Sequence, residues 1–151
     1  MIIYIGADHR GFKLKEFLKK FLFDKGYEVV DVGASVEVVD DDYPDYAGQV
    51  AQKVSGDPTA GKGILICGSG FGVDIVANKF KGVRSALPMS PDHAYQARHD
   101  DDVNVLSLSA DFIPEEAEAA KIVQVFLSTP FAKEAKYSRR LTKISAIEDS
   151  M

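Results

Sequence analysis

One glycine-rich turn carries the residues best suited to chemistry. The only cysteine, Cys67, ends a short apolar run and is followed by Gly68-Ser69-Gly70-Phe71-Gly72. A buried strand that stops at such a turn before a helix leaves backbone N–H groups free to bind an anion, or an oxygen that becomes anionic during a reaction. The helix N-terminus also favours the thiolate of a nearby cysteine. Two interpretations are open: a base or nucleophile beside an oxyanion site, or a buried structural cysteine.

A second polar group follows the first apolar run of the chain. Asp8 and His9 come directly after residues 2–6, a segment typical of a buried strand. Polar side chains there either face a ligand or serve local structure, Asp8 as a helix cap and His9 as a surface residue. A cysteine hydrolase that pairs Cys67 with His9 or His99 is a further alternative.

The sequence does not indicate a cofactor site. The turn after the first strand lacks the glycine spacing of a dinucleotide fingerprint, and the cysteine turn lacks the Lys-Ser/Thr ending of a nucleotide phosphate loop. The three histidines and Cys67 show no paired metal-ligand spacing. The sequence therefore disfavours a nucleotide cofactor and a zinc site.

Apolar strands and amphipathic helices alternate along the whole chain. This pattern predicts an α/β protein, with one Rossmann-like three-layer α/β/α domain over residues 1–151 and a five-stranded parallel sheet. The expected strands are residues 2–5, 28–32, 63–67, 83–87 and 103–108. The expected helices are residues 13–25, 45–54, 73–79, 91–100, 114–127 and 130–143. Ser90 is the expected cap of the fourth helix and Pro114 the expected first residue of the fifth.

The fold class brings three segments to one edge of the sheet. Ligands of such sheets bind beyond the carboxyl ends of the strands. The loop after the first strand, the acidic loop 40–42 that ends at Tyr43, and the cysteine turn should therefore meet. The acidic loop is expected to be a solvated helix cap, and Tyr43 either lines the pocket or packs as a hydrophobic staple.

Composition limits the class of partner. The 151 residues carry a formal net charge of -5, which argues against a nucleic-acid-binding protein but not against a phosphorylated small molecule. A single cysteine forms no internal disulfide, the first residues do not resemble a signal peptide, and no apolar run reaches membrane-spanning length. We expect a cytoplasmic protein without a membrane partner.

Several motifs together resemble the family of type B ribose-5-phosphate isomerases and galactose-6-phosphate isomerases. The resemblance covers nearly the whole chain, in order and with the expected spacing, and rests on residues 6–12, 42–47, 63–72, 77–79 and 104–106. It implies a Rossmann-like fold, a sugar phosphate substrate, no metal or organic cofactor, and a homodimer or tetramer with active sites shared between subunits.

The resemblance also implies roles for single residues. Cys67 would be the general base that moves a proton between C2 and C1 of the sugar through a cis-enediolate, with Asp8 and Ser69 shuttling the proton between the two oxygens. The substrate-binding residues would be the oxyanion-binding turn of Gly68, Gly70, Phe71 and Gly72, the phosphate-binding His9, Lys136 and Arg140, and Tyr43 at the sugar.

Some residues depart from the family pattern. Asp100 stands where the family has the histidine that helps to open the sugar ring, with His99 one place earlier, and Asp101 replaces an asparagine. Asp111 stands where a phosphate-binding arginine is expected. Asp100 could itself act as the ring-opening base. Arg10, where the family often has a small residue, could compensate for the added carboxylates.

We therefore predict an aldose–ketose isomerase, with ribose 5-phosphate and ribulose 5-phosphate as the leading pair. Two alternatives remain open: an isomerase for a hexose phosphate, and a catalytically silent sugar-phosphate-binding or hetero-oligomeric partner subunit.

Overall fold

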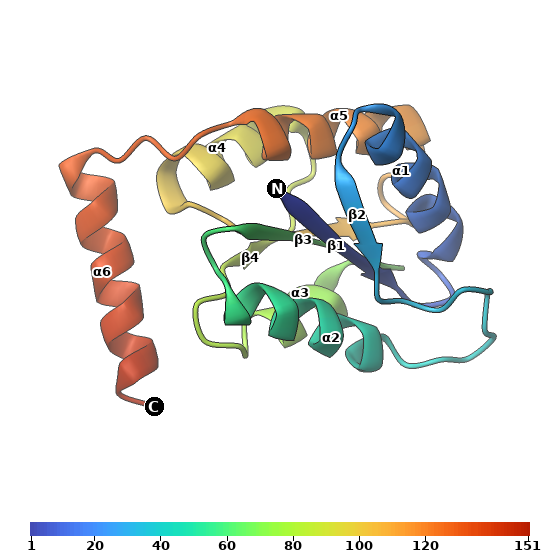
Figure 1. The fold of residues 1–151 in the computed structure, drawn as a ribbon, viewed down its shortest axis with the longest axis horizontal. Coiled ribbons are helices and arrows are strands. Elements are labelled where there is room, and N and C mark those ends of the chain that lie inside the picture. Colours follow the sequence, from blue (N-terminus) through green and yellow to red (C-terminus); the bar gives the residue numbers. More distant parts are fainter.

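The computed structural model describes residues 1–151 and contains one sheet of five parallel strands (Figure 1). The strand order is β2-β1-β3-β5-β4, and neighbouring strands pair in parallel throughout. This confirms the predicted sheet. The strands are β1 (Ile2–Ala7), β2 (Glu28–Asp31), β3 (Gly61–Cys67), β4 (Ser85–Ala86) and β5 (Val105–Ser109).

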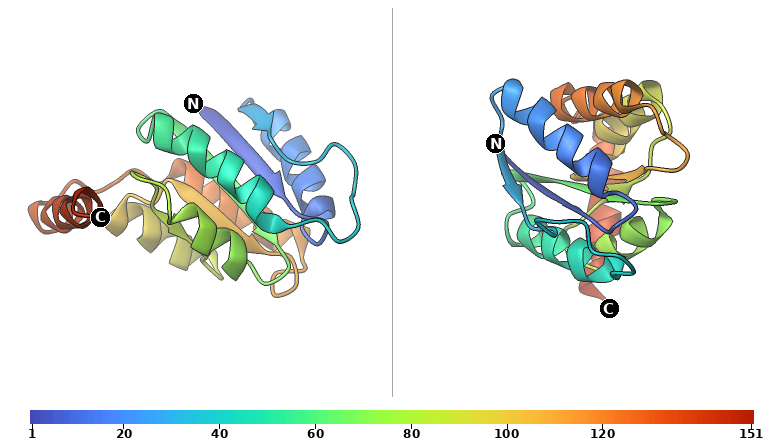
Figure 2. Two further views of the ribbon diagram at one scale, coloured as in Figure 1. Left: turned by 90° about the horizontal axis from the view of Figure 1, so that it is seen from below. Right: turned by 90° about the vertical axis from the view of Figure 1, so that its right-hand side faces the viewer.

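Helices cover both faces of the sheet. α1, α4 and α5 lie on one face and α2 and α3 on the other, as the end-on view in Figure 2 shows. The predicted three-layer α/β/α arrangement is therefore confirmed, whereas a single independently folding domain over residues 1–151 stays a prediction. The helices are α1 (Phe12–Asp24), α2 (Tyr43–Gly56), α3 (Phe71–Ala77), α4 (Pro91–Asp101), α5 (Glu116–Ser128) and α6 (Ala135–Asp149).

The central strand β3 joins two apolar cores. Every one of its residues is buried, as expected for a parallel strand covered on both faces. Because side chains alternate along a strand, Ile64 and Ile66 pack against the α1, α4 and α5 layer, while Leu65 and Cys67 pack against α2 and α3. Each buried aliphatic side chain contributes roughly 2 kcal/mol. This packing fixes the direction in which the Cys67 side chain points.

Several predicted boundaries were wrong, among them those of β4, α5 and α6. β4 begins later than predicted: the Arg84 carbonyl accepts from the amides of Asn104 and Val105, but the Arg84 amide donates to the Asn104 side chain at 2.8 Å and not to a strand backbone. The fifth helix begins at Glu116, not at Pro114. The last helix begins at Ala135 rather than at Pro130, since the Ala132 amide donates to the His99 carbonyl and ties that segment to α4. The predicted Ser90 cap is confirmed, with its hydroxyl accepting from the His93 amide at 3.1 Å.

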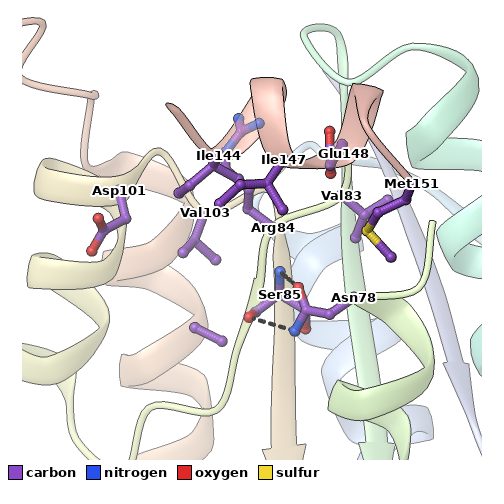
Figure 3. A pocket seen from close by; sticks show the side chains of 11 residues that line it. Asn78, Val83, Arg84, Ser85, Asp101, Val103, Ile144, Ile147, Glu148 and Met151 are labelled. Carbon is purple, nitrogen blue, oxygen red and sulfur yellow. Dashed lines mark hydrogen bonds between the residues drawn. The ribbon is translucent and has the colours of Figure 1, made fainter. Parts of the chain in front are cut away.

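α6 stands apart from the three layers at one end of the molecule (Figure 1), and none of its side chains is buried. Its last turn meets the body where the Glu148 carboxylate accepts from the Gly82 amide. Beside this contact, Ile144 and Ile147 face Val83 and Val103 across a shallow pocket (Figure 3). No helix in the structure is both long enough and apolar enough to span a membrane.

Candidate active site

A pocket of about 440 Å³ opens at the carboxyl edge of the sheet, within the size range of small-molecule sites. It lies between β1 and β3, at the point where the strand order reverses, because β1 leads to β2 on one side and β3 leads to β4 and β5 on the other. Ligands of this architecture usually bind at such a switch point. Residues 8–10, residues 41 and 43, and the cysteine turn all line it. The predicted meeting of the three segments is therefore confirmed.

Cys67 sits at the base of this pocket and is almost fully buried. Its Sγ accepts a hydrogen bond from the Gly70 amide at 3.2 Å. Gly70 has a φ of +83°, a left-handed conformation that favours glycine and turns the backbone back over the sulfur. An N–H donor at this distance stabilises a thiolate more than a thiol.

The cysteine turn also presents amides with no acceptor. The backbone N–H groups of Gly68, Ser69 and Gly72 form no hydrogen bond within the chain, while the Phe71 amide donates to Ser69 Oγ at 3.3 Å. Unpaired donors next to a polar pocket are available to a ligand oxygen. The turn thus has free amides that suit an oxyanion, its role in binding one stays a prediction, and the Phe71 amide is already occupied.

Asp8 combines the two roles that the sequence left open. Its Oδ1 accepts from the amides of Arg10 at 3.0 Å and Gly11 at 3.1 Å, so it stabilises the turn that leads into α1, whose N-cap residue is Gly11. It also lines the pocket, where its exposed fraction is only 5%. Burial raises the pKa of this carboxyl, although the two amide bonds oppose the shift. A raised pKa brings the carboxyl closer to neutral pH, which suits a group that must accept a proton in one step and release it in another.

Sequence reasoning missed a partner of His9. Asp41 Oδ1 lies 2.8 Å from both the backbone N and the Nδ1 of His9. This bond raises the pKa of His9. Asp8, His9 and Asp41 offer ligand atoms within 4.8 Å of one another, but the hydrogen bonds described here account for their closeness. The only signal in the sequence was the acidic run 40–42, which was interpreted as a solvated cap.

Tyr43 lines the opposite wall of the pocket. Its ring lies against Gly72, where an added Cβ would come within 2.5 Å of the ring Cζ. Tyr43 therefore lines the pocket, its contact with a ligand stays a prediction, and any side chain at position 72 would push the ring out of place. Arg10 lines the pocket too, and its Nη2 donates to Asp111 Oδ2.

Asp100, Lys136 and Arg140 are not in this pocket. α4 runs from the carboxyl edge of the sheet back to the amino edge, so its last turn lies at the far end from Cys67 (Figure 1). There the Asp100 carboxylate lies 2.7 Å from His99 Nδ1, a contact that lowers the pKa of Asp100. The His99 ring stacks on Tyr95 with centroids 5.0 Å apart. Lys136 and Arg140 lie beside Tyr137, which meets the same histidine edge-on.

The like-charge repulsion among the acidic residues at the end of α4 is reduced by two nearby arginines. Asp102 pairs with Arg84 at 3.0 Å and with Arg98 at 2.8 Å. This carboxylate therefore has a structural role, which the sequence pattern alone did not reveal.

Residues 3–144 match the model of a protein family described as ribose/galactose isomerase. The chain belongs to this family. Among its relatives, a probable ribose-5-phosphate isomerase B of Mycoplasma genitalium is 43% identical, covering 97% of this chain and 95% of the relative. The ribose-5-phosphate isomerase B of Escherichia coli K12 is 40% identical, covering 97% of this chain and 95% of the relative.

Solved structures of the family share the fold closely. The Mycoplasma genitalium ribose-5-phosphate isomerase B with bound ribulose-5-phosphate has a TM-score of 0.95 and 42% identity, covering 99% of this chain and 97% of that one. The Thermotoga maritima ribose 5-phosphate isomerase has a TM-score of 0.89 at 42% identity, covering 96% of this chain and 97% of that one. The expected family membership is confirmed.

Proposed function

We propose that this chain is an aldose–ketose isomerase that interconverts ribose 5-phosphate and ribulose 5-phosphate. The observation that carries the proposal is the juxtaposition of the buried Cys67 sulfur with unpaired amides in the pocket at the carboxyl edge. The family membership supports the substrate class, because a relative of nearly identical fold binds ribulose-5-phosphate.

In the proposed reaction the Cys67 thiolate removes the proton from C2 of the open-chain aldose. The electrons of the C–H bond form the C1–C2 double bond, and the carbonyl oxygen on C1 becomes the oxyanion of a cis-enediolate. The free amides of the cysteine turn stabilise this charge, and one such donor is typically worth roughly 3 kcal/mol. The thiol then gives its proton to C1 while the oxygen on C2 becomes the ketone.

Moving the proton between the two sugar oxygens requires a second group. Asp8 suits this step because its buried carboxyl has a raised pKa and lies in the same pocket. Ser69 Oγ is the other candidate, since it lines the pocket and accepts only one backbone hydrogen bond. His9 and Tyr43 would bind the phosphate and the sugar.

We further propose that two or more subunits assemble, with Asp100, Lys136 and Arg140 completing the pocket of a neighbouring copy. Because these three residues lie far from Cys67 in their own chain, they can contribute to catalysis only at the pocket of a neighbouring subunit. Three apolar side chains near the pocket are largely exposed, Phe71 by 64%, Phe112 by 69% and Met89 by 46%, which suits a subunit contact. The ionised Asp100, beside His99, would then serve as the ring-opening base.

The competing proposals are a hexose phosphate substrate and a silent partner subunit, both motivated by Asp100 and Asp111. An isomerase assay of the purified protein on ribose 5-phosphate and hexose 6-phosphates separates them. Cys67→Ala, purified in the same way, is the control for contaminating isomerases of the expression host. We expect turnover of ribose 5-phosphate and an oligomer by light scattering. Turnover confined to hexose phosphates, no turnover without an added subunit, or a lone 16.5 kDa species would contradict the respective part of the proposal.

A further inference from the structure

The pocket holds one permanently charged cation. Arg10 is the sole lysine or arginine that lines it, whereas Asp8 and Asp41 are carboxylates and His9 is already bonded to Asp41. A phosphate monoester carries nearly two negative charges at neutral pH. Within one subunit, the guanidinium is thus the only permanent positive charge that lines the pocket for such a dianion.

Arg10 is fixed at both ends. Its backbone amide donates to Asp8 Oδ1 at 3.0 Å, which holds the root of the side chain. A Cβ added to Gly68 would lie 2.6 Å from Cζ, 2.7 Å from Nε and 2.8 Å from Nη1. These nearly equal distances place the flat face of the guanidinium over Gly68, a contact that any larger residue would block.

Asp111 holds the far end of the guanidinium through Nη2. Asp111 is itself tied to the cysteine turn, because its amide donates to the Gly68 carbonyl at 3.0 Å. Ser109 Oγ donates to the same carbonyl at 2.7 Å. Arg10, Gly68 and Asp111 thus form one connected unit next to the Cys67 sulfur.

We infer that Arg10 binds the substrate phosphate within its own subunit, and that Asp111 is a positioning residue that holds the guanidinium over Gly68 for this purpose. An arginine presents five N–H donors in a fixed fork, and Asp111 contacts only one terminal nitrogen. The other nitrogens remain for the phosphate. The inference rests on the proposed function for the identity of the ligand.

This arrangement predicts that removal of Asp111 weakens phosphate binding, whereas simple charge repulsion predicts that it tightens binding. A carboxylate beside an anion site weakens anion binding if it acts only through its charge, so its removal would tighten binding. If Asp111 instead holds Arg10 in place, its removal frees the guanidinium to move and weakens binding, because a fixed donor loses less entropy on binding than a mobile one.

The test compares Arg10→Ala, Asp111→Ala and Asp111→Asn by KM and kcat for ribose 5-phosphate and by competitive inhibition with inorganic phosphate. Loss of a charged hydrogen bond predicts that Arg10→Ala raises KM and the phosphate inhibition constant roughly tenfold to hundredfold, with kcat little changed. Asp111→Ala should raise KM and the phosphate inhibition constant severalfold, and Asp111→Asn should raise them less. In the double variant, Asp111→Ala should cause no further rise beyond that of Arg10→Ala.

Lys13→Ala is the matched control, since it removes one positive charge from an exposed position of α1 three residues from Arg10. It should leave both constants unchanged. An unchanged KM in Arg10→Ala overturns the phosphate role, and a lower KM in Asp111→Ala overturns the positioning role.

The failure of this inference is distinct from a failure of the proposed function. If the wild-type protein turns over ribose 5-phosphate and Arg10→Ala does so with the same KM, only the inference falls. If the wild type shows no turnover, titration calorimetry with ribose 5-phosphate still decides whether Arg10 contributes to binding.

Discussion

At the scale of single residues, the pairing of His9 with Asp41 decides the charge of the pocket. The two residues are 32 positions apart, yet the same carboxylate oxygen lies 2.8 Å from the backbone N and the ring Nδ1 of His9. Because this bond raises the pKa of His9, the imidazole stays protonated at a higher pH than a free histidine. A protonated His9 adds a second positive charge to the pocket, beside that of Arg10.

We predict that Asp41→Asn lowers the pKa of His9 towards its ordinary value of 6.5. In the wild type, KM for ribose 5-phosphate should rise as the pH increases through the raised pKa of His9, and in the variant this rise should begin at lower pH. NMR titration of the histidine rings together with KM profiles checks both effects. The His93 resonances serve as the internal control, and coincident His9 titration curves in the two proteins would contradict the assignment.

The residues that follow the strands were predictable from the sequence, while their partners were not. Asp8, His9 and Cys67 follow buried strands directly, so the fold class alone places them at one edge. Asp41 and Asp111 became visible only in three dimensions, because each pairs with a side chain from a distant segment. A motif records which residues are near in the chain, and these pairs are near only in the fold.

At the scale of secondary-structure elements, a buried ion pair attaches α1 to β2. Lys15 is fully buried, with its Nζ 2.7 Å from Asp31 Oδ2 and 2.8 Å from the Ala34 carbonyl. Burial alone would raise the pKa of Asp31, but the bonds from Lys15 and Lys19 outweigh it and lower that pKa. The stability from this pair is therefore present above the ordinary pKa of an aspartate and is lost as the pH falls through the lowered value.

We predict that Asp31→Asn lowers the free energy of unfolding by about 3 kcal/mol at pH 7, because it leaves the buried Lys15 charge without its main partner. The loss should shrink in acid as the pH falls through the lowered pKa of Asp31 in the wild type. Urea denaturation of the wild type and the variant, at pH 7 and in acid, measures the loss of unfolding free energy under each condition.

Asp24→Asn is the matched control for that experiment, since Asp24 pairs with Lys20 on the exposed face of the same helix. An exposed pair of this kind contributes less than about 1 kcal/mol. Equal losses in the two variants, or a loss in Asp31→Asn that does not depend on pH, would contradict the structural role of Lys15.

Element boundaries show where sequence patterns lose their predictive value. The apolar periodicity of the first helix and the turn residues before the second and third located all three within two residues of their observed starts. The last helix was misplaced because its start depends on the hydrogen bond between Ala132 and His99 in another element. The start of β4 was placed too early because the Asn104 side chain, and not a strand carbonyl, accepts from the Arg84 amide.

At the scale of the whole molecule, the predicted site residues are divided between two ends. The Cys67 pocket lies at the carboxyl edge of the sheet, and the cluster of Asp100, Lys136 and Arg140 lies beyond the amino edge. The order of strands and helices predicted the sheet and its ligand edge, and the family resemblance predicted the isomerase. The separation of the two clusters depends on the direction of α4 in the fold, which motifs do not express.

The direct test of the account is the fate of the hydrogen on C2. With ribose 5-phosphate deuterated at C2, the wild-type protein should show a primary isotope effect on kcat/KM and release deuterium to water. Cys67→Ala should lose isomerisation and exchange together, by roughly a thousandfold, while calorimetry still detects binding of the sugar phosphate. Exchange at the wild-type rate in Cys67→Ala, or transfer of all the deuterium to C1 without dependence on Cys67, would contradict the role of the cysteine as the base.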